Sequence, residues 1–416
     1  MMREAKSSGI AWIGTIPKCW ETDKLKYHLR RNEPRNPGDV VVLSLYRELG
    51  VIPKDSRDDN HNVTSEDTSK YKYVRPGDFV INKMKAWQGS VAVSEYEGIV
   101  SPAYFVYEFT DDTIFKRYFH YLLRSCYKDE FMRLSGGIRV GQWDLPADAL
   151  ENTPILIPPM DEQCRIADFL DAKCAEIDAL TADIQTQIDT LEQYKRSVIT
   201  ETVTKGLNPN AEMKDSGIEW VEQMPMSWNT VPNKYLMYKI KSICPIYNGE
   251  NILSLTTNGV IIRDLNGGGK MPTSFDGYQK IVPGNLLMCL FDIDVTPRCI
   301  GLIKDYGLTS PAYSQFAMKD GAYAPYYYYY YLMVDYTKEL LHMAKNLRHS
   351  LTEDQLGAIK APNPPYEEQV QIAEFLDKKC VEISRVIEDK NKQLATLDEY
   401  KKSLIFEYVT GKKEIV

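Results

Sequence analysis

The sequence predicts two globular domains of the mixed α/β (α+β) class, joined by two long antiparallel coiled-coil helices, with an internal pseudo-two-fold repeat. The chain of 416 residues is longer than one domain usually needs. One long segment occurs twice with few changes, and each copy carries the seven-residue apolar spacing of a coiled coil.

The repeat defines the order of the parts. Residues 157–178 and 363–384 are identical at 13 of 22 positions, at an offset of 206 residues. A Ser-Gly-Ile-x-Trp sequence opens each half, at residues 8–12 and again at 216–220. We therefore expect a first domain, a first helix, a second domain, a second helix and a short C-terminal tail, with the boundaries 1–156, 157–206, 207–362, 363–411 and 412–416.

The shared segments are expected to be helices that pack on each other. A sustained heptad of apolar residues is typical of a helix–helix seam. A Pro-Pro pair precedes each helix, and acidic residues follow it, where they favour the dipole of the first turn. The two-fold repetition favours antiparallel helices with one domain at each end. The predicted seam residues are Leu170, Ile177, Ile184, Leu191 and Val198 in the first helix and Leu376, Ile383, Leu397 and Leu404 in the second.

The globular halves combine short strands with single helices. Residues 39–45 and 78–81 are β-type runs between glycine and proline turns. Helical stretches are expected at 114–134 and at 325–344, and the second contains six consecutive tyrosines, 326–331. These tyrosines could form a stacking platform for bases, but a helix that docks an aromatic face in the core is the favoured interpretation.

Composition excludes several classes of protein. No run of 18 apolar residues is present, and the N-terminus lacks the apolar core of a secretory signal. Eight scattered cysteines without a Cys-x-x-Cys pair favour reduced thiols in a cytoplasmic protein and argue against a zinc module. Of the net charge of −8, the segments 156–206 and 362–416 carry −5 and −2, so the two long domains are nearly neutral. A neutral domain can still present a basic face to DNA.

The repeated motifs resemble those of the specificity subunit of type I restriction–modification systems. The resemblance lies in Pro-Pro-x-x-Glu-Gln at 158–163 and 364–369, the Ile-Ala-x-Phe-Leu-Asp that follows each, and Leu-x-x-Tyr-Lys at 191–195 and 397–401. It implies that each variable domain reads one half of a split DNA site. The paired helices would separate the domains and dock two methylation subunits, with restriction subunits as a further partner.

The same resemblance implies that the chain has no catalytic centre of its own, so that S-adenosylmethionine, Mg²⁺ and ATP belong to partner subunits. Because the two domains differ in sequence, the recognised site should be asymmetric.

Contacts to double-stranded DNA are expected from basic and amide side chains on loops, where phosphate contacts position the protein and bidentate contacts read bases. Residues 82–89 combine charge, an amide and an aromatic ring, and residues 135–142 contain glycines that allow close backbone approach. A surface salt bridge is the usual alternative role for each charged residue. The candidates are Lys83, Lys85, Trp87, Gln88, Arg139 and Gln142 in the first domain, and Arg263, Lys270, Arg298, Asn346, Arg348 and His349 in the second.

Two other functions remain open from the sequence. Asn363-Pro364-Pro365-Tyr366 matches the tetrapeptide with which adenine-N6 methyltransferases hold a flipped base. The repeat partner at 157–160 keeps the prolines and loses the Asn and Tyr, which favours a structural role as the start of a helix. The chain could also be a coiled-coil scaffold that does not bind DNA. Nothing in the spacing of His and Cys indicates a metal site.

Overall fold

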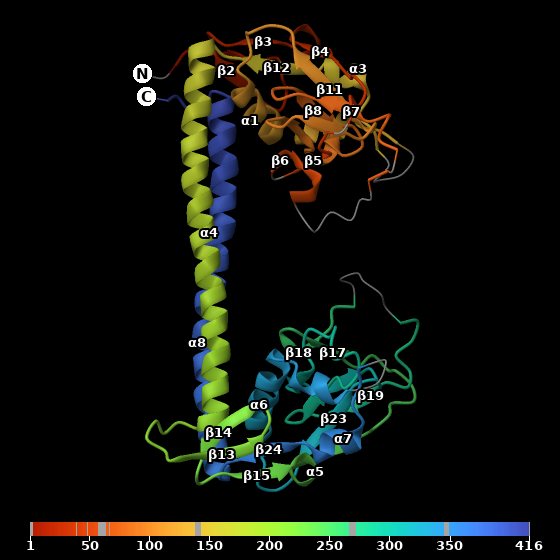
Figure 1. The fold of residues 1–416 in the computed structure, drawn as a ribbon, viewed down its shortest axis with the longest axis vertical. Helices are drawn as coiled ribbons and strands as arrows, with labels where there is room; N and C mark the ends of the chain where they lie inside the picture. The colour runs from red at the N-terminus through yellow and green to blue at the C-terminus, as the bar shows by residue number, and fades with distance from the viewer. Residues whose placement is uncertain are drawn as a thin grey trace. The chain divides into compact units, whose positions relative to one another are not determined.

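The computed structural model describes residues 3–38, 40–47, 49–56, 64–65, 67–137, 143–265, 272–344 and 349–415. The chain forms two compact units. Unit 1 comprises Met1–Ile184 and Lys392–Val416, and unit 2 comprises Gln185–Asn391. Each unit therefore contains one globular part together with a piece of both long helices (Figure 1).

Unit 1 is built on a four-stranded antiparallel sheet with the order β4-β11-β8-β9. Its strands are β4 Leu29–Arg31, β11 Tyr104–Phe109, β8 Phe79–Asn82 and β9 Val91–Val93. All four residues of β8 are buried, because the strand lies inside the sheet and both of its faces are covered. Helix α1, Lys116–Cys126, packs Phe119 edge-on against Phe79, with ring centroids 5.2 Å apart.

Shorter elements complete unit 1. The two-stranded pairs are β1 Ala5–Ser7 with β2 Thr15–Pro17, β3 Glu21–Lys24 with β12 Pro154–Ile157, β5 Leu43–Tyr46 with β6 Gly50–Pro53, and β7 Lys72–Val74 with β10 Gly98–Val100. The short helices are α2 Lys128–Leu134, α3 Ala147–Glu151, and the 3₁₀ turns η1 Leu25–Tyr27, η2 Lys54–Ser56 and η3 Ala86–Gln88.

Unit 2 repeats the same topology although most of its sequence differs. Its central sheet has the order β16-β23-β20-β21, with strands Met237–Ile240, Ser314–Met318, Leu286–Met288 and Ile300–Leu302. The pairs are β13 Met213–Ile218 with β14 Val221–Pro225, β15 Asn229–Pro232 with β24 Lys360–Asn363, β17 Leu253–Thr256 with β18 Gly259–Ile262, and β19 Gln279–Ile281 with β22 Gly307–Thr309. The helices are α5 Asn233–Leu236, α6 Ala324–Tyr336, η4 Glu339–Met343 and α7 Glu353–Ala358.

The predicted helical stretches end where the backbone leaves helical geometry. Residues 114–134 form two helices, α1 and α2, separated at Tyr127. Helix α6 stops before Lys338, whose φ of +55° is left-handed and cannot continue a helix. Five of the six consecutive tyrosines are buried, and the Tyr330 hydroxyl accepts a hydrogen bond from Trp220 Nε1 at 3.0 Å. The prediction of a core helix is confirmed.

The two long helices are α4, Met160–Lys205, and α8, Tyr366–Val409. In unit 1 the rings of Phe169 and Tyr408 are 4.5 Å apart, and Lys401 Nζ lies 2.6 Å from Asp178 Oδ1. The partner number falls along α8 as the position rises along α4, so the segments run antiparallel. In unit 2 Lys195 Nζ donates to Ser384 Oγ at 2.8 Å.

The predicted seam residues lie on the paired faces of these helices within their own units. Lys390 interrupts the apolar row of α8 and donates a hydrogen bond to Gln187 of α4, so this break in the heptad is a polar contact between the helices. Leu170, Ile177, Ile184, Leu376, Ile383 and Leu404 are buried, and Leu191, Val198 and Leu397 are half-buried.

The repeated Glu-Gln pair fixes each globular part to the start of a long helix. In unit 1 Trp20 Nε1 donates to Glu162 Oε2 at 2.9 Å, and in unit 2 Trp228 Nε1 donates to Glu368 Oε2 at the same distance. The glutamine that follows accepts a backbone N–H of its globular part, from Phe115 to Gln163 at 2.7 Å. Both tryptophans are fully buried. These contacts explain why the motif occurs twice.

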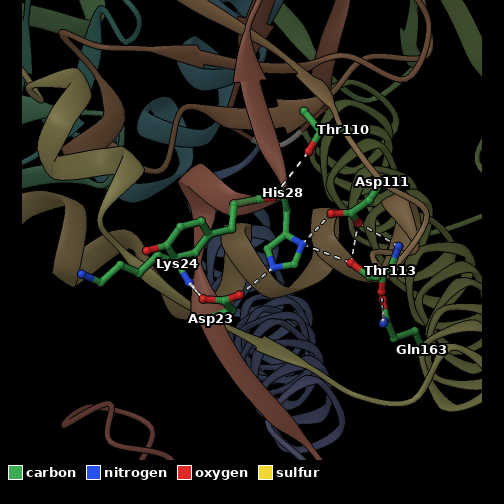
Figure 2. A network of polar contacts seen from close by, with 8 residues as sticks. Asp23, Lys24, His28, Thr110, Asp111, Thr113 and Gln163 are labelled. Carbon is green, nitrogen blue, oxygen red and sulfur yellow. Dashed lines mark hydrogen bonds and ion pairs between the residues drawn. The ribbon is translucent and has the colours of Figure 1, made fainter.

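Unit 1 adds a charged network beside this attachment (Figure 2). His28 Nδ1 lies 3.0 Å from Asp111 Oδ2, and its Nε2 lies 3.4 Å from Asp23 Oδ2. Gln163 Nε2 donates to the carbonyl of Thr113, which joins the network to α4 at 2.8 Å. In unit 2 the residue directly before the corresponding strand is Leu236, so an apolar side chain occupies that place.

Candidate DNA interface

In unit 1, the segment that follows β8 passes through the exposed residues Met84 and Lys85 into the 3₁₀ turn η3. Asn82 Oδ1 accepts the backbone N–H of Met84 at 3.1 Å, and the turn η3 ends at Gly89, whose φ is +87°. A left-handed residue at this position favours glycine, because a Cβ would be strained there. The segment 83–89 is therefore presented on a rigid strand end.

Two tryptophans contact each other at the segment 83–89. Trp87 Nε1 donates to the carbonyl of Met84 at 3.0 Å, so its indole is fixed across the turn. Trp143 meets Trp87 edge-on with ring centroids 5.6 Å apart. Both residues are half-buried. Trp143 was not among the predicted residues, because it is distant in sequence from the turn.

The predicted lysines differ in their availability. Lys83 Nζ is 2.8 Å from Asp144 Oδ2, and both side chains are partly exposed. The charge of Lys83 is therefore partly neutralised by Asp144. Lys85 is exposed and has no ion pair recorded among the described residues. An exposed lysine of this kind suits phosphate contact.

The predicted amide Gln88 is held by an arginine that the sequence did not single out. Arg47 Nη2, in the turn between β5 and β6, donates a hydrogen bond to Gln88 Oε1. The carbonyl of Arg47 in turn accepts from Arg124 Nη2 of α1. Burial, with the neighbouring charge of Arg124, lowers the pKa of His120 to about 4, so at neutral pH this histidine adds no charge. The positive charge of the face comes from its arginines and lysines.

Five predicted contacts lie outside the described residues. The backbone of Gly136 and Asp144 exchanges two hydrogen bonds, at 3.1 and 2.9 Å, and Asp144 also pairs with Lys83. The residues concerned are Arg139 and Gln142 in the first domain and Lys270, Asn346 and Arg348 in the second.

In unit 2 the corresponding segment is the loop 289–299, between β20 and β21. Three non-glycine residues with positive φ meet at this loop: Asp292 at +47°, Lys338 at +55° and His349 at +41°. Ile293 N donates to the carbonyl of His349 at 3.3 Å, and Lys338 Nζ donates to the carbonyl of Thr296 at 2.6 Å. Backbone strain of this kind is concentrated at functional sites. Aspartate and histidine adopt positive φ more often than most other residues, but the residue type does not mark the position, so sequence reasoning missed Asp292 and Lys338.

A buried acid holds the base of this loop. Asp335 Oδ2 accepts the backbone N–H of Cys299 at 2.8 Å, and Asp335 Oδ1 lies 2.8 Å from Lys338 Nζ. Burial, reinforced by the charge of Asp335, raises the pKa of the Cys299 thiol to about 12, so the thiol stays protonated at neutral pH. The loop is rigid at its base.

The remaining predicted residues of the second domain have different surroundings in the structure. His349 Nε2 is 3.8 Å from Asp294 Oδ2 on the loop. Arg263 directly follows β18. Burial raises the pKa of Tyr313, and the charge of Arg263 opposes this increase. The ring of Tyr313 is stacked on Phe291 of the loop. Arg298 belongs to the loop by sequence, but its charge lies near Tyr328 of α6.

The Asn363 tetrapeptide has a structural role in this fold. The Asn363 side-chain oxygen accepts hydrogen bonds from Tyr327 Oη at 2.9 Å and from Gln369 Nε2 at 3.3 Å. Asn363 also ends β24, which pairs with β15. An amide engaged in this way cannot also hold an adenine without losing these bonds. Within the described part of the chain, no group of three or more His, Cys, Asp or Glu side chains is placed to hold a metal ion.

The comparisons with known proteins agree with this architecture. The family model described as type I restriction modification DNA specificity domain matches residues 28–190. A type I restriction enzyme MjaVIII specificity subunit from Methanocaldococcus jannaschii is 25% identical, over 95% of this chain and 93% of that protein. The chain is therefore similar, over nearly its whole length, to specificity subunits of type I restriction–modification systems. A second similar protein of that organism, a putative type I restriction enzyme MjaX specificity subunit, is 24% identical over 96% of this chain and 95% of its own length.

Solved structures share the fold of this chain. A chain from work described as the structural basis underlying complex assembly and conformational transition of the type I R-M system superposes with a TM-score of 0.71. It is 15% identical, and the match covers 96% of this chain and 99% of that one. The HsdS subunit from Thermoanaerobacter tengcongensis has a TM-score of 0.50 at 15% identity, with coverage of 96% and 98%. The predicted fold class is confirmed. Among the described residues, no helix is long and apolar enough to span a membrane.

Proposed function

We propose that this chain is a specificity subunit that reads an asymmetric two-part DNA sequence, with each unit recognising one half. The observation that carries the proposal is the contrast within the repeat. The sheet order and the Trp–Glu attachment to the helices are the same in both units, whereas the partly exposed segments 83–89 and 289–299 differ in sequence. A shared frame with different faces is the arrangement expected of two readers with different target sequences.

The helices offer matched surfaces for two copies of a partner. In unit 1 the exposed Tyr400 lies near Lys173, which pairs with Glu176 at 2.8 Å. In unit 2 the exposed Tyr194 lies near Lys379, which pairs with Glu382 at 3.0 Å. Two equivalent surfaces favour two methylation subunits, with restriction subunits joining the same complex.

In this proposal the chain itself is not catalytic. S-adenosylmethionine, Mg²⁺ and ATP would be bound by the partner subunits, and this chain would determine where they act. The engaged amide of Asn363 supports this view over methyl transfer by the chain alone.

The proposal is tested by expressing the methylation subunit in a methylation-free host, with and without this chain, and mapping methylated adenines across the genome. We expect an asymmetric two-part motif when both proteins are present and none with the methylation subunit alone. Methylation by this chain alone would overturn the proposal in favour of catalysis at Asn363. No methylation with both proteins would favour a scaffold that does not direct DNA modification.

A further inference from the structure

The contact between Arg47 and Gln88 fixes the chemistry of one point on the face of unit 1. Arg47 Nη2 donates to Gln88 Oε1, although the two residues are 41 positions apart. The backbone of each partner makes a further hydrogen bond. The backbone N–H of Gln88 donates to the carbonyl of Lys85 at 2.9 Å, and the carbonyl of Arg47 accepts from Arg124. Arg47 is exposed and Gln88 is half-buried, so the pair lies at the surface with a defined geometry.

This contact engages the acceptor that a glutamine normally offers. A free glutamine side chain presents both a carbonyl acceptor and an amide donor. When Oε1 of Gln88 accepts from Arg47, one of its two lone pairs is used and a cation lies beside it, so the side chain faces a ligand mainly with its Nε2 amide, which is a donor. Arg47 has five N–H groups and no acceptor, and one of the five is used within the pair. The pair therefore presents donors.

A face of donors distinguishes the base pairs of the DNA major groove. Guanine presents two acceptors, N7 and O6, whereas adenine presents the acceptor N7 beside the N6 amino donor. Arginine is the side chain that most often binds guanine, through two parallel hydrogen bonds. Adenine would place its amino group against the N–H groups of Arg47 or Gln88, and two facing donors repel each other.

We propose that Arg47 and Gln88 together specify a guanine in the half-site read by unit 1. Arg47 contacts N7 and O6, and Gln88 positions Arg47 and excludes adenine by presenting its amide donor. This inference rests on the proposed DNA-reading function and names the base at one position. The corresponding loop of unit 2 carries Asp292 and Asp294, so its half-site is read by different chemistry.

The test maps methylation motifs for variants of the full chain co-expressed with the methylation subunit. For Arg47→Ala we expect the preference for guanine at one position to fall about 10- to 100-fold, the range of one bidentate contact. Adenine should gain most at that position, because Oε1 of Gln88 becomes free to accept from its amino group. Gln88→Ala should weaken the guanine preference by a smaller factor, and adenine should gain less than in Arg47→Ala, because the N–H groups of Arg47 still face its amino group. The other half-site should keep its sequence in both variants.

Two further variants separate base reading from folding and from charge. Arg47→Lys keeps the positive charge but cannot form the two parallel bonds, so methylation should continue with a relaxed position. Arg30→Ala is the matched control, since Arg30 is an exposed arginine of unit 1 that pairs with Glu108 on the sheet, and its motif should equal that of the wild type.

Several outcomes would overturn the inference. In the first, Arg47→Ala changes the base preference at a position that is not guanine in the wild-type motif. In the second, the variant loses methylation equally at all sites. In the third, the recognised sequence changes in both halves. An equal loss would indicate a phosphate contact. Failure of the proposed function is a different result, because the wild type would then produce no two-part motif.

Discussion

Replacing Glu162 by alanine should destabilise unit 1 through a defined set of lost contacts. The glutamate is buried, and its Oε2 accepts hydrogen bonds from Trp20 Nε1 at 2.9 Å and from Arg3 Nη2 at 2.6 Å. Trp20 is fully buried, so the variant leaves its N–H without a partner in the interior. An orphaned buried donor costs about 1–3 kcal/mol, and loss of the partly exposed Arg3 pair adds up to about 1 kcal/mol.

The expected decrease in the free energy of unfolding is therefore about 1–4 kcal/mol. For a unit of this size, each 1 kcal/mol shifts the unfolding midpoint by about 2–4 °C, so the midpoint should fall by roughly 2–16 °C. The assay is thermal unfolding of the full chain, together with hydrogen exchange of the α1 amides to assign the change to unit 1.

Asp161→Ala is the matched control, because Asp161 is the preceding residue of the same helix turn, is exposed and pairs only loosely with Arg165 at 3.4 Å. We expect its effect to stay within about 0.5 kcal/mol. The reasoning is refuted if both variants have the same stability, or if Glu162→Ala increases exchange in unit 2 rather than in unit 1.

Three further predictions concern acid stability, catalysis and assembly. Burial opposes ionisation of Glu33, but hydrogen bonds from Arg31 and Lys72 outweigh it and lower the pKa of the carboxyl below 4.5. The ionised Glu33 carboxylate therefore stabilises the fold above pH 4.5, and this stabilisation is lost as the pH falls through the lowered pKa. In urea titrations, Glu33→Gln should be less stable than the wild type at about pH 7 and equally stable at about pH 2. Asn363→Ala should lower stability by about 1 kcal/mol while adenine methylation by the complex continues, and loss of methylation with intact assembly would contradict this. Tyr194→Ala and Tyr400→Ala should each weaken one of two binding events for the methylation subunit in calorimetry, and unchanged stoichiometry and affinity in both variants would contradict the docking role.

Much of the fold could be predicted because it depends on local periodicity. The heptads predicted α4 and α8, and the apolar tyrosine run of α6 indicated a core helix. The acidic first turns were interpreted through the helix dipole alone. The structure adds that Glu162 is buried under Trp20, a long-range contact that no local pattern contains.

The face that binds DNA in our proposal was predicted less completely. Lys85, Trp87 and Gln88 could be proposed from the sequence because they lie together in one loop. Arg47 was missed because a hairpin 41 residues away brings it to Gln88, and pairing of that kind is set by the sheet rather than by spacing in the sequence. The positive φ of Asp292 could not be predicted either, because aspartate adopts it more often than most residues but only at a few of its positions, and the residue type does not mark which one.

The most direct test of the central claim measures binding of the assembled complex to the two-part sequence found by methylation mapping. Competitor DNAs would carry both halves, either half with the other scrambled, or both halves with one base pair added to the gap. The account predicts that scrambling either half and lengthening the gap each weaken binding at least tenfold at physiological salt. Equal affinity for DNA with one half scrambled would show that only one unit reads sequence, and would contradict the account.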